Sequence, residues 1–250
     1  GAYGGAGLLA AKAALRAGAG LVTWALPRSV ARAMAGRLPE AILSGIDDDG
    51  DGNWSAASAG RLTELAENKK AAVIGPGIAR FPGDAEWLRQ LWTELPIPLV
   101  LDADALNILA DSRGLSQWPS RRAAAVLTPH PGEMARLTGL AVPDIQRDRI
   151  GTARALAVQH GVIVVLKGAR TVTALPDGRA FVNPTGNSGM GTGGAGDILA
   201  GLLAGLLAQG LPPEAAAVGG VFLHGEAGDR AAENRPSPAS LLAGDILDAL

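Results

Sequence analysis

Short apolar runs alternate with helical patterns along most of this chain, and no other feature of the sequence constrains the fold as strongly. The apolar runs are bounded by turn residues and occupy residues 21–26, 71–75, 98–103, 124–128 and 162–168. The helical patterns that separate and flank them occupy residues 8–17, 56–68, 84–94, 132–137 and 145–160. Near-continuous apolar strands that alternate with helices are typical of a parallel sheet covered by helices on both faces.

Residues 171–182 depart from this pattern, because two alternating segments flank turn residues at 176–178. They predict a β-hairpin and therefore an antiparallel edge to the sheet. Helical segments follow from residue 197 on, and neither a linker nor a repeat interrupts the chain. We predict one α/β domain over residues 1–250, a three-layer α/β/α sandwich. Because helical periodicity begins within a few residues of the start, we expect this domain to lack its first strand at the N-terminus.

Composition excludes several classes of protein. The 22 basic and 24 acidic residues nearly cancel, and a nucleic-acid surface needs a basic patch, so we expect no nucleic-acid partner. The chain has no cysteine, which excludes disulfides, thiolate metal sites and cysteine nucleophiles and is compatible with the reducing cytoplasm. The most apolar run, residues 198–211, is too short for a membrane span, so we expect no membrane association.

The segment NPTGNSGMGTGGAGDILAG, residues 183–201, concentrates glycines directly before an apolar helix. Within it, Gly191, Gly193 and Gly196 match a dinucleotide-binding spacing. That motif requires a strand leading directly into the glycines and a second parallel strand after the helix. Here a long loop precedes the glycines and further helices follow, so we reject a Rossmann site.

The end of this segment still predicts an anion site. Gly194, Ala195 and Gly196 lie where the next helix begins, and backbone N–H groups at such a position favour phosphate oxygens. Asp197 falls in the first helical turn, where it either complements the helix dipole or acts as a base toward a hydroxyl that attacks phosphorus. Because so many glycines cost conformational entropy, we favour the base, and phosphoryl transfer as the reaction.

Polar motifs follow other predicted strands directly, namely GPGIAR at 75–80, DADALN at 102–107, TPHPGE at 128–133 and KGART at 167–171. Ligands bind beyond the carboxyl ends of parallel strands, so these motifs are expected to line one cleft. Asp104 suits a helix N-cap as well as a functional role. Asp102 or Asn107 is expected to orient phosphates or a magnesium ion bound through water.

The histidines divide into one candidate and two structural residues. In TPHPGE, the proline and glutamate suit an ordinary helix start, whereas His130 has no such structural role and is expected to contact substrate. His160 and His224 lie in helical patterns and are expected to be structural. Histidines this scattered speak against a zinc site, and we assign no metal ligand.

One acidic segment, DDDGDGNWSAAS at residues 47–58, has the start of a calcium-binding loop but Ser58 where a glutamate is needed. We interpret it as a solvated surface turn, with Ser55 capping the next helix.

Five motifs, in this order, resemble those of the bacterial ADP-dependent NAD(P)H-hydrate dehydratases, repair enzymes with a ribokinase-like fold. The motifs are VIGPGIA, LVLDADALN, VLTPHPGEMARL, VVLKGARTV and TGNSGMGTGGAGDILAG. The likeness covers almost the whole chain. The sequence departs from the family at Ala79, where a glycine is usual, at Gly191, where alanine is usual, and at Ala195, where the family has Thr or Ser. The last change removes a hydroxyl but keeps the backbone donors.

The resemblance implies a reaction that recovers NADH or NADPH from the S-epimer of a hydrate with a hydroxyl at C6 of the nicotinamide ring. The β-phosphate of ADP is transferred to that hydroxyl with Mg²⁺ present, and loss of phosphate restores the double bond. Asp197 would take the hydroxyl proton, and the nest Gly194, Ala195 and Gly196 would hold the β-phosphate. ADP would be contacted by Lys167, Gly168, Ala169, Arg170 and Thr171, and the hydrated nucleotide by Ala6, Gly77, Asn107, His130 and Asp197.

Two other functions remain alternatives. A ribokinase-like kinase for a vitamin-precursor alcohol, such as hydroxyethylthiazole or a pyridoxal-type compound, would use the same Gly-Ala-Gly-Asp chemistry. TPHPGE and GNSGMGTGG resemble the dehydratases more closely. A non-catalytic adenine-nucleotide sensor would bind ADP without needing Asp197 as a base. The small-residue helices also lead us to expect a homo-oligomer.

Overall fold

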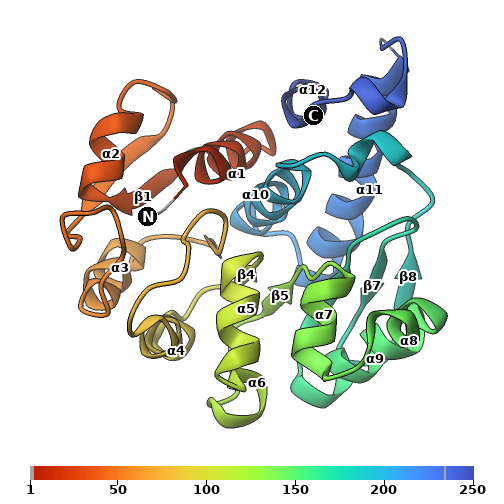
Figure 1. Ribbon diagram of the computed structural model, residues 1–250, viewed down its shortest axis with the longest axis horizontal. Coiled ribbons are helices and arrows are strands. Elements are labelled where there is room, and N and C mark those ends of the chain that lie inside the picture. Colours follow the sequence, from red (N-terminus) through yellow and green to blue (C-terminus); the bar gives the residue numbers. More distant parts are fainter. Residues whose placement is uncertain (1–2, 234) are drawn as a thin grey trace.

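Two β-sheets of unequal size lie between layers of helices in the computed structural model, which describes residues 3–233 and 235–250 (Figure 1). The strands are β1 Thr23–Pro27, β2 Ile42–Ile46, β3 Ala72–Ile74, β4 Leu99–Leu101, β5 Ala125–Leu127, β6 Ile163–Leu166, β7 Val172–Ala174 and β8 Ala180–Val182. The helices are α1 Gly4–Arg16, α2 Arg28–Met34, α3 Ser58–Ala66, α4 Asp84–Glu94, α5 Asp104–Asp111, α6 Gly114–Gln117, α7 Pro131–Thr138, α8 Val142–Arg147, α9 Arg149–His160, α10 Ala195–Ala208, α11 Pro213–Glu233 and α12 Ala243–Asp248. Short 3₁₀ turns, η1 Ser188–Gly191 and η2 Pro238–Ser240, complete the elements.

The larger sheet has the strand order β3-β4-β5-β6-β7-β8, and its strands are parallel as far as β6. β7 runs antiparallel to β6, and β8 pairs with β7 as the second strand of a hairpin. The predicted α/β/α sandwich with an antiparallel edge is therefore confirmed. No helix in the described part of the chain is both long and apolar enough to cross a bilayer.

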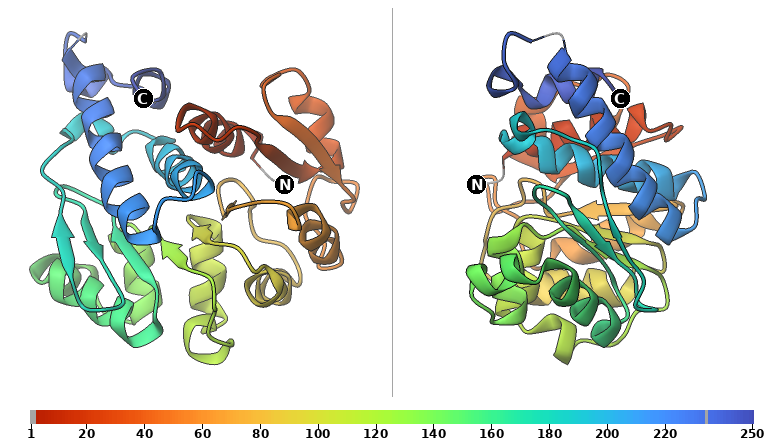
Figure 2. Two further views of the ribbon diagram at one scale, coloured as in Figure 1. Left: turned by 180° about the vertical axis from the view of Figure 1, so that it is seen from behind. Right: turned by 90° about the vertical axis from the view of Figure 1, so that its right-hand side faces the viewer.

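Burial on both faces explains why the central strands are continuous apolar runs. In β4, Leu99 and Leu101 join the core formed with α4, α5, α7 and α9. Val100 points the other way and joins the core formed with α10 and α11. The right-hand view of Figure 2 shows these two helical layers on opposite sides of the sheet.

Two glycines of α10 let this helix approach α1 closely. A Cβ on Gly201 would lie 2.0 Å from the carbonyl oxygen of Ala10, and one on Gly205 would lie 2.6 Å from the Cβ of Ala17. Real Cβ atoms do not come this near to other heavy atoms, so a larger residue would force the helices apart. Part of the glycine density after residue 183 therefore serves helix packing and is not evidence of ligand binding.

Three local predictions were wrong. The pattern at 145–160 forms two helices, because the Asp148 carboxylate accepts from Gly151 N at 2.8 Å and starts α9 anew. The strand predicted at 21–26 begins at Thr23 and pairs with β2 in a separate two-stranded sheet. β2 itself was not predicted, because it is too exposed to have an apolar pattern. Ser55 does not cap α3, because the hydroxyl of Ser58 donates to its carbonyl instead.

Candidate functional site

The site begins at the carboxyl ends of β3 and β4, where two loops meet without intervening side chains. Asp102, directly after β4, donates its N–H to the Ile74 carbonyl at 3.1 Å. Gly75 has φ +132°, and a Cβ there would lie 1.7 Å from the Asp102 carbonyl oxygen. Only glycine permits this approach, so the GPG turn after β3 holds the backbone of Asp102 in place.

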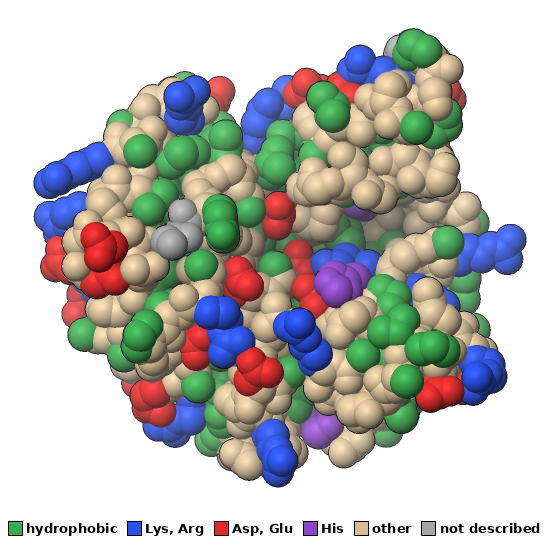
Figure 3. Space-filling model, viewed as in Figure 1, with side chains coloured by type: hydrophobic (Ala, Val, Ile, Leu, Met, Phe, Trp, Pro, Cys, Tyr) green, Lys and Arg blue, Asp and Glu red, His purple; other side chains and the backbone are tan. Residues whose placement is uncertain are grey.

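A buried ion pair links the ends of β4 and β6. The Nζ atom of Lys167 lies 2.5 Å from Oδ1 of Asp102, whose side chain is only 2% exposed. Oε2 of Glu133, from the first turn of α7, is 3.9 Å from the same Nζ. We call Asp102, Glu133 and Lys167, together with Asp197 below, the charge corner. In Figure 3, acidic, basic and histidine side chains meet in the hollow of the viewed face.

His130 has the structural role that the sequence argument denied it. Its Nδ1 accepts from the N–H groups of Gly132 (2.9 Å) and Glu133 (3.2 Å), while Oε2 of Glu133 accepts from His130 N at 2.8 Å. This is a capping box in which histidine replaces the usual Ser or Thr. Burial and the charge of Lys167 lower the pKa of His130, which keeps Nδ1 available as an acceptor. The side chain remains 56% exposed, so its outer edge is still open to a ligand.

Glu133 is the residue that the sequence argument missed. It was assigned only to a helix start, but its side chain is 7% exposed, and burial raises its pKa to about 7 despite the opposing charge of Lys167. A buried carboxyl with such a pKa beside a cation is a common mark of a functional site. The available signal was its place in TPHPGE, the polar motif that directly follows β5.

Asp197 completes the charge corner from the start of α10. The N-cap Gly194 has φ +96°, and no side chain caps the helix. The Ala195 N–H donates to the Thr192 carbonyl at 3.4 Å, and the amides that follow lie at the exposed start of the helix, where they favour an anion. A Cβ on Gly196 would lie 3.3 Å from Nζ of Lys167 and 3.6 Å from Oδ2 of Asp102. Burial, reinforced by the charge of Asp102 and opposed by Lys167, raises the pKa of Asp197 to about 6. The predicted base and phosphate nest thus lie beside the ion pair.

Polar contacts fasten the loop before this nest to α11. Asp229 accepts from Gly186 N at 2.8 Å and from Nδ2 of Asn187 at 2.9 Å. His224, predicted to be structural, lies on the same helix beside the backbone of Ala195, and burial lowers its pKa to about 4. Its Nε2 is buried without a partner among the described residues. The backbone of the nest at Ala195 therefore lies beside a neutral histidine.

Ala6 and Gly77, the two small residues assigned to the hydrated nucleotide, are brought together. Tyr3 N donates to the Gly77 carbonyl at 2.8 Å, and a Cβ on Gly77 would lie 3.3 Å from the Cβ of Ala6. Two residues on, Ala79 has φ +60° and donates its N–H to Oδ2 of Asp104 at 3.0 Å. Asp104 therefore holds this loop through a hydrogen bond. It is not the N-cap of α5, which is Ala103.

The segment assigned to ADP divides in two. The Lys167 side chain turns inward to Asp102, whereas residues 168–171 form a tight turn whose first three residues are exposed, with Gly168 at φ +141° and Arg170 at φ +55°. Nη2 of Arg149 donates to the carbonyls of residues 166 and 167 at 2.9 and 3.2 Å and anchors the end of β6.

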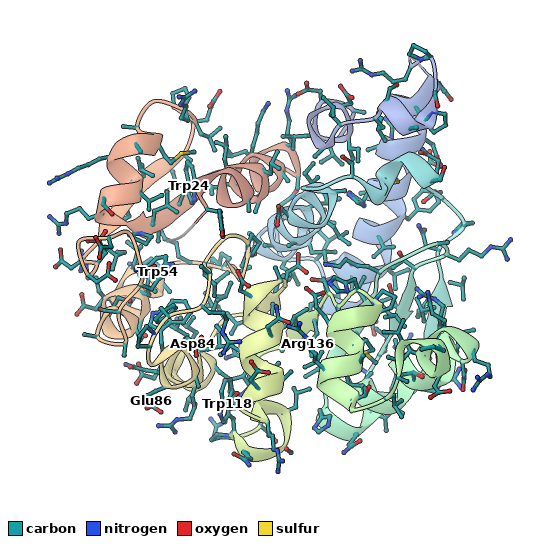
Figure 4. The ribbon with its side chains drawn as sticks, viewed as in Figure 1. Trp24, Trp54, Asp84, Glu86, Trp118 and Arg136 are labelled. Carbon is teal, nitrogen blue, oxygen red and sulfur yellow. The ribbon has the colours of Figure 1, made fainter. Side chains whose placement is uncertain are left out.

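Asn107 lies apart from these groups. Its Oδ1 accepts from Nη1 of Arg136 at 2.7 Å, which joins α5 to α7 (Figure 4). No hydrogen bond or ion pair between described residues connects it to the charge corner. Nor do the described residues include a cluster of three metal-ligating side chains. The acidic turn contains a local network instead, in which Asp49 accepts from Asp51 N and Asn53 N.

An α/β/α sandwich with a glycine nest and an acid at one helix start defines the ribokinase-like class of proteins. Within it, residues 1–250 match the NAD(P)H-hydrate dehydratase family, and the chain belongs to that family. The match favours the dehydratases over the vitamin-precursor kinases.

Similar proteins agree with this placement. A bifunctional NAD(P)H-hydrate repair enzyme of Moorella thermoacetica is 46% identical over 247 residues, which are 98% of this chain and 46% of that protein. The ADP-dependent (S)-NAD(P)H-hydrate dehydratase of Neisseria meningitidis is 40% identical, covering 98% of this chain and 79% of the relative. A crystal structure of the ADP/ATP-dependent NAD(P)H-hydrate dehydratase of Bacillus subtilis, co-crystallised with ATP/Mg²⁺ and soaked with CoA, has a TM-score of 0.82 at 32% identity. The match covers 98% of this chain and 84% of that one. The chain spans about half the length of the bifunctional relatives.

Proposed function

We propose that this protein catalyses the ADP-dependent dehydration of the S-epimer of hydrated NADH and NADPH, forming NAD(P)H, AMP and phosphate. The observation that carries the proposal is the Asp197 carboxylate, placed at an uncapped helix start beside the buried Lys167–Asp102 pair. Family membership supports the choice of substrate. The absence of cysteine supports a cytoplasmic location, and the small-residue helices support self-association.

Each group of the charge corner has a defined task in this proposal. Asp197 accepts the proton of the C6 hydroxyl as that oxygen attacks the β-phosphorus of ADP and AMP leaves. The amides of Gly194–Gly196 hold the phosphate oxygens, because a helix start favours anions. Lys167 shifts from Asp102 toward the charge that develops on the transferred phosphoryl group. Phosphate then leaves C6 with the electrons of the C6–O bond while a proton leaves C5 to water, and this elimination restores the ring double bond.

Mg²⁺ would fit this site bound together with the nucleotide phosphates. The ion keeps several water ligands and uses one or two carboxylates plus substrate phosphates, so it needs no cage of protein ligands. Asp102 and Glu133 would hold its water shell, because their carboxylates flank Lys167 and Oδ2 of Asp102 faces Gly196. When bound, the ion neutralises phosphate charge. His130, Ala6, Gly77 and Asn107 remain the proposed contacts of the hydrated nucleotide, and Gly168–Thr171 those of ADP.

The test is direct. Protein, the S-hydrate of NADH, ADP and Mg²⁺ are mixed, the return of reduced-nicotinamide absorbance is followed, and AMP is measured by chromatography. We expect AMP and NADH to form in equal amounts, with no recovery when ADP is omitted. Phosphorylation of hydroxyethylthiazole or a pyridoxal-type alcohol without NADH recovery would replace the proposal by a kinase. ADP binding without turnover of either kind would replace it by a sensor.

A further inference from the structure

A cavity of about 510 Å³ lies among α5, α6, α7 and α9, and none of its lining residues belongs to the charge corner. We call it the helix cavity. Apolar and polar side chains share its lining, among them Leu137, Leu156, Thr138, Thr152 and Gln159. Cavities of this size that combine apolar walls with a few polar groups are typical of small-molecule sites. The lining suits a ligand with a flat apolar body and several hydrogen-bonding groups, such as a nucleoside.

Two neighbouring helices lead from the charge corner to this cavity. α5 begins two residues after Asp102, and α7 begins directly after His130, at the carboxyl ends of the paired strands β4 and β5. The helices lie side by side, and the last turn of each lines the cavity, at Ala110 and Thr138 (Figure 1). An α-helix rises 1.5 Å per residue, so the cavity begins roughly 9 Å beyond His130, at Arg136. A ligand held at His130 therefore needs an extended shape to reach the cavity.

A polar bridge joins these two helices midway along their length. Nη1 of Arg136 donates to Oδ1 of Asn107 at 2.7 Å, and Figure 4 shows the arginine between α5 and α7. The Nδ2 donors of Asn107 and the remaining guanidinium N–H groups have no partner among the described residues. The free groups of the bridge are therefore mainly donors, which suit the oxygens of a phosphate.

Arg136 also carries a charge that no carboxylate compensates. In the described part of the chain it forms no ion pair, and neither does Arg113, which lines the same cavity. Burial has the largest effect on the pKa values of His130 and Glu133, lowering the first and raising the second, and the charge of Arg136 lowers both. Arg136 thus acts on the charge corner and also lines the helix cavity, so it lies between the two.

We propose that the helix cavity binds the adenosine of the hydrated NADH or NADPH, and that Arg136 and Asn107 bind the diphosphate between its two nucleosides. This inference rests on the proposed function, which holds the nicotinamide ring of the hydrate at His130 and Asp197. From there the dinucleotide extends along α5 and α7, so its diphosphate meets the bridge and its adenosine reaches the cavity. Removing Arg136 therefore affects only substrates that carry the diphosphate.

Substrates of two lengths test the role of Arg136. The S-hydrate of NADH is compared with the corresponding hydrate of reduced nicotinamide riboside, which has the reacting ring but neither diphosphate nor adenosine. Each is assayed with ADP and Mg²⁺ for the wild type, for Arg136→Gln and for the control Arg154→Gln, which changes an exposed arginine of α9. We expect Arg136→Gln to raise KM for the NADH hydrate about 10–100-fold, the effect of losing a hydrogen bond to a charged group. KM for ADP and kcat/KM for the riboside hydrate should equal those of the wild type.

A variant that fills the helix cavity tests the place of the adenosine. Ala155 lines the cavity from α9 at an exposed position, so Ala155→Phe adds a ring there without disturbing the core. It should raise KM for the NADH hydrate and leave kcat/KM for the riboside hydrate unchanged, which also shows that the variant is folded. An unchanged KM for the NADH hydrate would overturn the assignment of the adenosine to this cavity.

The remaining outcomes are equally decisive. Equal losses on both substrates, or no loss on either, would remove Arg136 from the binding of the diphosphate. A loss confined to the NADPH hydrate would assign Arg136 to the 2′-phosphate and overturn the proposed position of the diphosphate. No turnover of either hydrate by the wild type would overturn the proposed function, and this inference with it. Turnover that does not depend on Arg136 or on the cavity overturns this inference alone.

Discussion

The charge corner and a second cavity, of about 430 Å³ between β1 and β3, lie on either side of the loop after β3, and they differ in what burial leaves unsatisfied. In the charge corner, burial raises the pKa of Asp197 and Glu133, and one lysine compensates three carboxylates. In the second cavity, apolar walls enclose Trp24 and Trp54, whose indole N–H groups have no acceptor among the described residues. A buried excess of negative charge indicates a site for chemistry, because a bound ligand can interact with those charged groups. The second cavity contains no such excess of charge, because its lining is mainly apolar.

The largest effect is expected from removing the charge of Asp197. Asp197→Asn should lower turnover by about 10²–10⁴-fold, the usual contribution of a general base, and should leave ADP affinity unchanged in titration calorimetry. Asp51→Asn, an equivalent change in the exposed acidic turn, is the control and should retain full activity. An Asp197→Asn enzyme with near-normal turnover would remove this residue from the mechanism.

The same substitution should stabilise the fold above pH 6. The folded pKa of Asp197, about 6, exceeds the ordinary value, so folding favours its protonated form. Wild-type stability should therefore fall as pH rises through the window from the ordinary value to about 6. Above that window Asp197→Asn, which lacks the charge, should be more stable by roughly 1–2 kcal/mol in denaturant titrations.

Breaking the ion pair should change the stability of the fold by more than the Asp197 charge does. Lys167→Met leaves Asp102 buried and unpaired, which typically costs about 3–5 kcal/mol. Adding Asp102→Asn removes the stranded charge and should restore most of that loss, measured by urea unfolding in a double-mutant cycle. If the double variant is no more stable than Lys167→Met, then the unpaired charge of Asp102 is not the cause of the lost stability.

A smaller shift is expected in the pH dependence of activity. kcat/KM should rise with pH through about 6 as Asp197 loses its proton, because the base acts in its charged form. Asp102 raises the pKa of Asp197, so Asp102→Asn should move this limb to lower pH. The movement is checked by the pH–rate profile of each enzyme. A limb at unchanged pH would show that the two carboxylates do not interact.

The smallest effect concerns the loop between the two regions. Ala79 has φ +60°, which costs an alanine roughly 1–2 kcal/mol relative to glycine. Ala79→Gly should therefore raise Tm by about 2–4 °C, whereas Ala155→Gly, at an exposed position inside α9, should lower it, because glycine weakens a helix interior. A lower Tm for Ala79→Gly would mean that the loop depends on the alanine side chain.

Local patterns in the sequence determined most of the elements and the position of the proposed base. Strand and helix periodicity predicted the sandwich, the turn residues at 176–178 predicted the β7–β8 hairpin, and the glycines before Asp197 predicted a helix start with an acid in its first turn. These features depend on residues close together in the chain. They could therefore be predicted without knowing any contact between distant segments.

The tertiary structure alone decided how these parts combine. Lys167 and Asp102 are 65 positions apart, and only the order of β4, β5 and β6 brings their carboxyl ends together. The same order buries Glu133 beside them, although its sequence context indicates only a helix start. Some glycines, such as Gly201, proved to serve packing against α1. Burial and charge pairing depend on which strands are neighbours, and local sequence does not determine that.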